Sequence, residues 1–310
     1  MHDVSVAVLG EALIDLLPDG DGVVARPGGS PANVAVGLAR LQVPTAFLGR
    51  TSTDRWGQLI RTHLRDNGVD VGDAPTGTEP TAVAMVDVDA DGEPGYRFLW
   101  DRTADRMLDL TDLPDDLGAT TVLHVGSVSC VLQPGAEAIR ALVERERDDR
   151  IVAFDPNVRV GPGVHEDAAR TTLLDLARSA HVVKASEDDL AWLVPGQAAD
   201  DVAHDLAARD VSLVVITTGA AGARLVGQRA EVVVPARSGT VVDTVGAGDA
   251  FMAGLIAGLL DAGLDSIHRI HTADPGALRA AADLAVRVAA VTVSRVGADP
   301  PTRDDLERQT

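Results

Sequence analysis

The run Asp243-Thr-Val-Gly-Ala-Gly-Asp249 joins two glycines and a carboxylate to the start of an apolar stretch with helical character, residues 250–260. The first turn of a helix carries unpaired N–H groups and a partial positive charge, so it suits an anion such as phosphate. Gly246 and Gly248 let the backbone approach that anion closely. If the site served only to bind a phosphate, the negative charge of Asp249 would repel that ligand. The run therefore predicts a base that takes a proton from a hydroxyl attacking phosphorus.

The bulk composition bounds the class of protein. The chain has 310 residues, 45% of them hydrophobic, which is enough for a large α/β core. A net charge of -20 should repel nucleic acid and anionic membranes, so neither is expected as a partner. No apolar run approaches the length of a membrane span, and we expect a cytoplasmic protein. Lys184 is the only lysine and follows no glycine-rich loop, which excludes a Walker A site.

Short β-branched runs alternate with helical runs along the chain. This alternation predicts a doubly wound, mostly parallel α/β sheet covered on both faces. We expect a single domain, residues 1–310, because no linker or internal repeat interrupts the pattern. The expected strands are residues 4–9, 46–48, 121–125, 151–154, 181–183 and 213–216, and the expected helices are 32–41, 55–67, 135–147, 166–179, 202–209 and 250–260.

Two stretches, about 12–26 and 79–101, break the alternation. The first is extended, with Pro18, Gly20 and Gly22 marking turns, and the second is typical of a hairpin whose turn is residues 89–92. We expect these strands to form a small β lid over the strand ends, where ligands bind in such folds. The free edges of the lid would allow a homodimer.

Polar motifs follow several of the expected strands. Gly28, Gly29 and Asn33 form either a pocket for hydroxyl groups or an ordinary capped turn. Asp15 interrupts an apolar stretch, as a turn residue or as an acceptor for sugar hydroxyls. Arg159 lies two residues after an Asp-Pro-Asn turn and suits a phosphate or a substrate oxygen.

Two later motifs suit a nucleotide. Thr218 and two glycines follow the strand that ends at residue 216, and their hydroxyl and N–H groups can hold a phosphate or a ribose, although many strands end on glycine. The run Lys184-Ala-Ser-Glu-Asp-Asp189 opens a helix. Its acids are either partners of the helix dipole or groups that organise water around Mg²⁺.

Together these motifs resemble the ribokinase or PfkB family of carbohydrate kinases, most closely its fructokinase branch. Residues 28–33 look like the family's first signature, and residues 243–249 match its second in full. The resemblance extends over nearly the whole chain. It implies a ribokinase-like fold, and transfer of a phosphoryl group from ATP to a sugar hydroxyl, most closely that of fructose, with Mg²⁺ and K⁺ as cofactors.

The resemblance also implies a role for each matching residue. Asp249 is the catalytic base, and the N–H groups of Gly246, Ala247 and Gly248 form the anion hole. The implied sugar-binding residues are Asp15, Gly28, Gly29, Asn33, Arg97 and Arg159. The implied ATP-site residues are Thr218, Gly219, Gly222, Lys184 and Ser186.

The same resemblance implies two metal sites. Asp243 is similar to a family residue at a monovalent-cation site. The family's Asn-x-x-Glu pattern is replaced here by Ser186-Glu-Asp-Asp189, whose last acid is one methylene shorter. Either Asp189 or Glu187 would then grip Mg²⁺ through water.

Other functions stay open at this point. A kinase of the same family could act on 2-keto-3-deoxygluconate or ribose. A dinucleotide-dependent oxidoreductase is disfavoured because no Gly-x-Gly-x-x-Gly follows the first strand. A non-catalytic sugar-binding protein is a further alternative, against which the intact Asp249 argues.

Overall fold

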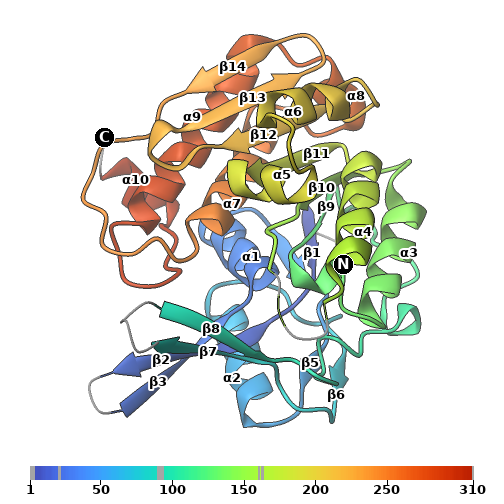
Figure 1. The fold of residues 1–310 in the computed structure, drawn as a ribbon, viewed down its shortest axis with the longest axis vertical. Coiled ribbons are helices and arrows are strands. Elements are labelled where there is room, and N and C mark those ends of the chain that lie inside the picture. Colours follow the sequence, from blue (N-terminus) through green and yellow to red (C-terminus); the bar gives the residue numbers. More distant parts are fainter. Residues whose placement is uncertain (1–3, 20–21, 89–93, 160, 162–163, 309–310) are drawn as a thin grey trace.

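The computed structural model describes residues 4–19, 22–88, 94–159, 161 and 164–308. Its main element is an eight-stranded sheet with the order β14-β13-β12-β11-β10-β9-β1-β4 (Figure 1). Neighbouring strands from β4 to β12 pair in parallel, and β13 and β14 add an antiparallel edge. The strands are β1 (Val6–Leu9), β4 (Thr45–Phe47), β9 (Val122–Gly126), β10 (Ile151–Asp155), β11 (Val182–Ser186), β12 (Leu213–Thr217), β13 (Ala223–Gly227) and β14 (Glu231–Val234).

Helices cover both faces of this sheet, which confirms the predicted fold class. Val6 and Val8 of β1 belong to one apolar core, and Ala7 and Leu9 to another, because successive side chains of a strand point to opposite faces. The first core includes α1 (Ser30–Arg40), α7 (Ala247–Asp261) and α9 (Pro275–Thr292). The second includes α3 (Gly135–Glu146), α4 (Glu166–Ser179), α5 (Glu187–Leu193) and α6 (Ala199–Ala207).

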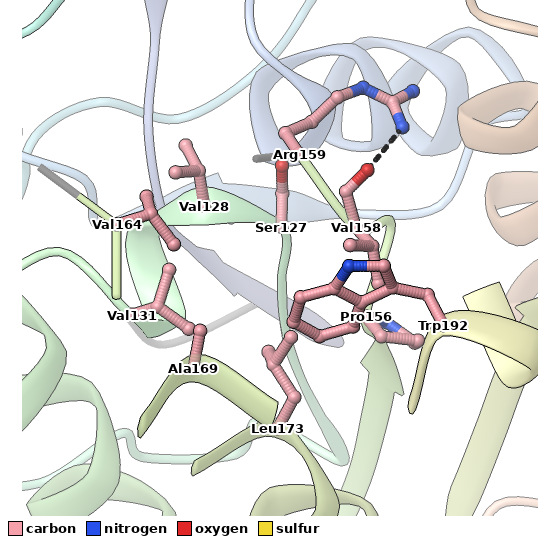
Figure 2. Close-up of a pocket in the computed structure, with 10 residues that line it drawn as sticks. All are labelled: Ser127, Val128, Val131, Pro156, Val158, Arg159, Val164, Ala169, Leu173 and Trp192. Carbon is pink, nitrogen blue, oxygen red and sulfur yellow. Dashed lines mark hydrogen bonds between the residues drawn. The ribbon is translucent and has the colours of Figure 1, made fainter. Parts of the chain in front are cut away.

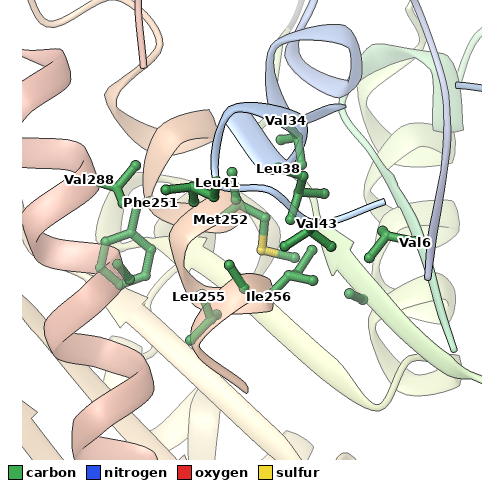
Figure 3. Packing of buried hydrophobic residues seen from close by; sticks show 14 of the residues in the cluster. Val6, Val34, Leu38, Leu41, Val43, Phe251, Met252, Leu255, Ile256 and Val288 are labelled. Carbon is green, nitrogen blue, oxygen red and sulfur yellow. The ribbon is translucent and has the colours of Figure 1, made fainter. Parts of the chain in front are cut away.

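Helix α7 is apolar on all sides and lies between α1 and α9 (Figure 3). Small residues allow this close packing. A Cβ added at Gly254 would lie 2.7 Å from Cα of Ala285, and one at Gly258 would lie 2.6 Å from Cα of Ala281. Helix α7 is therefore packed tightly against α9. Within the described ranges, no helix has the length and apolar character that crossing a membrane requires.

A second, four-stranded sheet has the order β3-β2-β7-β8 and stands apart from the large one, at the lower left of Figure 1. Strands β2 and β3 pair in antiparallel, and β2 pairs in parallel with β7. The predicted turn at 89–92 lies outside the described residues. The strands of this sheet are β2 (Leu13–Asp19), β3 (Gly22–Gly28), β7 (Val83–Val88) and β8 (Pro94–Leu99).

Shorter elements complete the fold. Helix α2 (Arg55–Asp66) begins at Asp54, whose side chain accepts a hydrogen bond from N–H of Gly57. It ends before Gly68, which has φ +83. The remaining elements are β5 (Thr51–Ser52), β6 (Thr76–Gly77), α8 (Ile267–His271), α10 (Arg303–Glu307) and the 3-10 turns η1 (Leu110–Asp112), η2 (Val128–Cys130) and η3 (Gly219–Ala221).

The order of the strands locates the site. The chain passes from β1 to β4 on one side and later to β9 on the other, so the direction of winding reverses at β1. In open α/β sheets, ligands bind at the carboxyl ends of the strands beside such a reversal. The predicted polar motifs follow β1, β10, β11 and β12, so the parallel strands bring them to this edge.

Candidate active site

Asp249 is the third residue of α7 and is only 8% exposed. Gly246 caps the helix in the left-handed region, with φ +74, and a Cβ there would lie 2.5 Å from Cβ of Ala298. Glycine alone meets both conditions without strain. The run thus turns sharply into α7 and places the Asp249 carboxylate at the positive end of the helix.

The backbone amides before Asp249 differ from one another. The N–H of Ala247 donates to the carbonyl oxygen of Thr244 at 3.2 Å. Those of Gly246 and Gly248 have no acceptor in the described part of the chain. Gly246 and Gly248 therefore offer free donors to an anion, whereas Ala247 would have to share or release its bond.

Helix α1 supplies two donors to the Asp249 carboxylate. The Ser30 hydroxyl donates to Oδ1 at 2.6 Å, and the Asn33 amide nitrogen donates to Oδ2 at 2.9 Å. Asn33, predicted to bind the sugar, thus also holds Asp249. Sequence reasoning missed Ser30, because its partner lies 219 residues away and no local pattern links the two.

The small sheet brings a second carboxylate to this site. Asp15 lies on β2, and a Cβ added at Gly28 would lie 2.1 Å from Oδ2 of Asp15, so the strands meet closely there. Burial, and then the negative charge of Asp249, raise the pKa of Asp15 to about 6. Gly29 caps α1 beside them. The structure therefore brings Asp15, Gly28, Gly29 and Asn33 together around Asp249.

A buried ion pair lies on the sheet side of the same loop. Nζ of Lys184 donates to Oδ2 of Asp155 at 2.8 Å, with side-chain exposures of 4% and 1%. A Cβ added at Gly248 would lie 3.0 Å from that Nζ. Burial opposes the charge of Lys184, but the Asp155 carboxylate outweighs it and raises the pKa of the lysine. A fixed ammonium thus lies against the amides before Asp249.

Comparison with known proteins identifies the family. The family model described as pfkB family carbohydrate kinase matches residues 3–305. The chain belongs to the pfkB family of carbohydrate kinases. It is 36% identical over 315 residues to a fructokinase of Klebsiella pneumoniae, covering 97% of each chain. The predicted family, fold and sugar-kinase activity are therefore confirmed.

Solved structures agree with the family assignment. A fructokinase double mutant from Vibrio cholerae O395, in a form bound to fructose, ADP and potassium ion, aligns with a TM-score of 0.87 and 30% identity, covering 99% of this chain and 98% of that one. An aminoimidazole riboside kinase from Salmonella enterica, complexed with aminoimidazole riboside and an ATP analog, aligns at 0.84 and 29% identity, covering 98% and 99%.

The nucleotide-side motifs of this pfkB kinase form two turns. Ser186 caps α5, its hydroxyl accepting from N–H of Asp189 at 3.0 Å. The Thr218 hydroxyl donates to the carbonyl oxygen of Gly222 at 3.1 Å, closing the turn that contains Gly219. Each motif thus has a structural role that leaves open what it binds.

The two acids predicted to hold Mg²⁺ through water, Asp189 and Glu187, differ in how accessible their carboxylates are. Oδ2 of Asp189 accepts from N–H of Ser186 at 2.9 Å, and Oδ1 accepts from N–H of Val158 at 2.8 Å. Asp189 is buried, whereas Glu187 is exposed. No group of three or more His, Cys, Asp or Glu side chains among the described residues could hold a metal ion by itself.

Asp243 ties the loop before α7 to the chain after α9. Its Oδ1 accepts from N–H of Val245 at 3.0 Å, and its Oδ2 accepts from N–H of Gly297 at 2.8 Å. The carboxylate is partly exposed. Oxygen donors of this kind suit a hard cation.

The structure does not bring Arg97 to the other predicted sugar residues. Arg97 of β8 lies opposite Met85 of β7. On the same sheet, Asp15 lies opposite Ala84, which lies opposite Phe98. Since strand side chains alternate between faces, Arg97 leaves the sheet on the face opposite Asp15. Within one chain it therefore emerges away from those residues, and its contact with the sugar stays a prediction.

Arg159 lies after β10 and is exposed. Figure 2 shows its guanidinium directed away from a small apolar pocket, with Nη1 donating to the carbonyl oxygen of Val158 at 2.8 Å. The pocket lies between the loop after β10 and helices α4 and α5. Arg159 is the one charged residue among the described residues that line it. Its lining residues include Val128, Val131, Val164, Ala169, Leu173 and Trp192.

Proposed function

We propose that the chain transfers the γ-phosphate of ATP to a hydroxyl of fructose. The observation that carries this is the convergence on Asp249 of free amides from its own helix, donors from α1 and the Asp15 carboxylate. Fructose is supported by curated fructokinases of about equal length and 35–36% identity. The structural neighbours bound to fructose and ADP give the same support.

Asp249 is the base in this proposal. It accepts the proton of the attacking sugar hydroxyl as the oxygen bonds to the γ-phosphorus, and ADP leaves on the opposite side. Charge on the phosphoryl oxygens is stabilised by the free N–H groups of Gly246 and Gly248, by that of Ala247 once it releases Thr244, and by the dipole of α7. The Lys184 ammonium, held by Asp155, adds positive charge next to the same amides.

Residues from several elements bind the sugar. The Asp15 carboxylate accepts hydrogen bonds from sugar hydroxyls, and the free side of the Asn33 amide donates or accepts another. Gly28 and Gly29 line the sugar site beside α1, and the absence of a side chain at Gly28 lets the Asp15 carboxylate approach closely. Arg159 meets an oxygen of the substrate once the loop after β10 adjusts around it.

The nucleotide lies along the second half of the sheet edge. Thr218, Gly219 and Gly222 line the ATP site with Ser186 and Lys184. Mg²⁺ neutralises charge on the phosphates when it is bound, and Glu187 and Asp189 would hold it through water. Asp189 would have to do so while keeping its present hydrogen bonds, so Glu187 is the better placed of the two. Asp243 would hold K⁺ beside the anion hole.

The chain works as a single domain, residues 1–310, with the small sheet as its lid. Strands of about 12–26 and 79–101 carry Asp15 to the site, so closure of this sheet over the sugar brings in a binding group and excludes water at the same time. Water is the competing acceptor, and its exclusion limits hydrolysis of ATP.

A substrate panel tests the proposed reaction. ADP release is measured with ATP, Mg²⁺ and K⁺ and with fructose, ribose, ketodeoxygluconate, adenosine or aminoimidazole riboside as acceptor. We expect fructose to give the highest kcat/KM, and replacement of K⁺ by choline to lower the rate. If no acceptor releases ADP above the sugar-free blank, the kinase assignment is wrong. A higher kcat/KM for another acceptor overturns only the choice of fructose.

The Asp15 carboxylate makes sugar binding depend on pH. Its pKa of about 6 means that the acceptor is lost as the pH falls through 6, so KM for fructose should rise about tenfold per pH unit below that value. The measurement is KM for fructose from about pH 5 to about pH 8, with Asp15→Asn as the control. That variant should have a high KM that no longer changes across this range. A wild-type KM that is flat down to pH 5 would contradict the role of Asp15.

The outer face of the lid supports a homodimer. Val23, Met85 and Leu99 are 67%, 37% and 53% exposed, and the strand registers place them on the same face as Arg97. An apolar face of this kind is commonly an interface in soluble proteins. We propose that Arg97 lies at this dimer interface.

Sedimentation velocity tests this interface. The wild type should sediment as a dimer at micromolar concentration, and Met85→Glu with Leu99→Glu should give a folded monomer. Val233→Glu introduces the same charge at a 60% exposed valine on the far edge strand β14 and should leave the dimer intact. A monomeric wild type would refute the proposal.

A further inference from the structure

Ser30 makes the shortest contact to the Asp249 carboxylate, at 2.6 Å between Oγ and Oδ1. Both residues are only 8% exposed, so water does not compete for this bond. A hydroxyl that donates to a carboxylate forms one of the stronger hydrogen bonds in proteins, and at this length it belongs to that class. The family assignment gives Ser30 no role.

We propose that Ser30 is a positioning residue for phosphoryl transfer, which keeps the Asp249 carboxylate aimed at the sugar hydroxyl. The proposal rests on the proposed function of Asp249 as the base. Ser30 does not touch the substrate in this account and acts only through Asp249.

The first argument is the charge around Asp249. The negative charge of Asp249 acts on Asp15 of β2 and on Asp155 of β10, and Lys184 of β11 donates to Asp155. Ser30 and Asn33 are the side-chain donors to Asp249 among the described residues. Because a hydrogen bond donated to a carboxylate favours its ionised form, loss of the Ser30 hydroxyl is expected to move the acid side of the rate profile to higher pH.

The second argument is orientation. Ser30 holds one carboxylate oxygen and Asn33 the other, so the plane of the carboxylate is fixed. The two helices that carry these groups cannot shift easily, since a Cβ added at Gly37 of α1 would lie 2.7 Å from Cβ of Ala253 in α7. The remaining lone pairs of Asp249 therefore keep one direction. Removal of the Ser30 hydroxyl frees one oxygen to rotate away from it.

The third argument is what a hydroxyl can do after proton transfer. Once Asp249 has taken the proton of the sugar, it becomes a donor. A serine hydroxyl can turn and accept, whereas the Asn33 nitrogen can only donate. Ser30 thus serves both protonation states of the base without movement of the backbone.

The test compares Ser30→Ala with Ser30→Thr, which keeps the hydroxyl. The readout is kcat at saturating fructose and ATP from about pH 5 to about pH 9, because saturation removes the effect of Asp15 on KM. Ser30→Ala should lower kcat about tenfold at neutral pH and move the acid-side midpoint of the profile up by about one pH unit. Its KM values should change little, and Ser30→Thr should restore the midpoint.

The matched control is Ser212→Ala, at a serine that is 1% exposed before β12 and whose hydroxyl has no hydrogen-bond partner among the described residues. It should leave both kcat and the midpoint unchanged. Thermal melts establish which variants fold. Should Ser30→Ala fail to fold, Ser30→Cys, a weaker donor of similar shape, carries the test and should give an intermediate midpoint.

The outcomes distinguish failure of the Ser30 proposal from failure of the proposed phosphorylation of fructose. A folded Ser30→Ala whose midpoint stays at the wild-type value overturns the role of Ser30, as does a folded Ser30→Thr that behaves like Ser30→Ala. In either case the wild type still phosphorylates fructose. Absence of fructose-dependent ADP release from the wild type would instead refute the proposed function itself.

Discussion

The N-termini of α1 and α7 meet at the Asp249 carboxylate, and the rest of the site is arranged around that contact. Each helix directs its positive end toward the carboxylate, and α1 adds the Ser30 hydroxyl and the Asn33 amide. A carboxylate that is 8% exposed would otherwise pay a large cost for its charge. The close packing of α7 between α1 and α9 keeps these groups at hydrogen-bonding distance.

The negative charge gathered at this site also explains the buried Lys184–Asp155 pair beneath the loop that precedes Asp249. Phosphoryl transfer brings several negative charges to a site that already holds Asp15 and Asp249, so a positive charge at a fixed position is useful. Lys184 can be buried with its charge because Asp155 accompanies it. A buried pair of this kind contributes little to stability by itself, since desolvation offsets the attraction. Its place against Gly248 indicates a contribution to function.

Much of this fold follows from sequence periodicity. Helix α4 spans residues 166–179 as predicted, and each expected strand of the large sheet is within three residues of the observed one at either end. Helix α1 starts at Ser30, two residues earlier than predicted, because Pro31 suits the first turn of a helix. Strands β13 and β14 and helix α9 were not predicted, since α9 is rich in alanine and the strands form an edge with weak alternation.

Prediction of the site was limited by a different cause. Asp15 and Gly28 meet because β2 and β3 pair in antiparallel, and Asn33 reaches Asp249 because the N-termini of α1 and α7 lie together. Ser30 and Asp155 were missed because their roles depend on partners distant in the sequence. The face on which Arg97 emerges could not be predicted, because the strand register, which a motif does not reveal, decides it.

The central claim is that Asp249 acts as the base for a sugar hydroxyl. Single-turnover transfer from ATP to fructose in Asp249→Asn tests it most directly, with fructose affinity measured on the same sample by calorimetry. The amide keeps the shape of the side chain but cannot take the proton, so the rate should fall by about 10³-fold while fructose affinity stays within a few-fold. Transfer at a rate near that of the wild type would contradict the account.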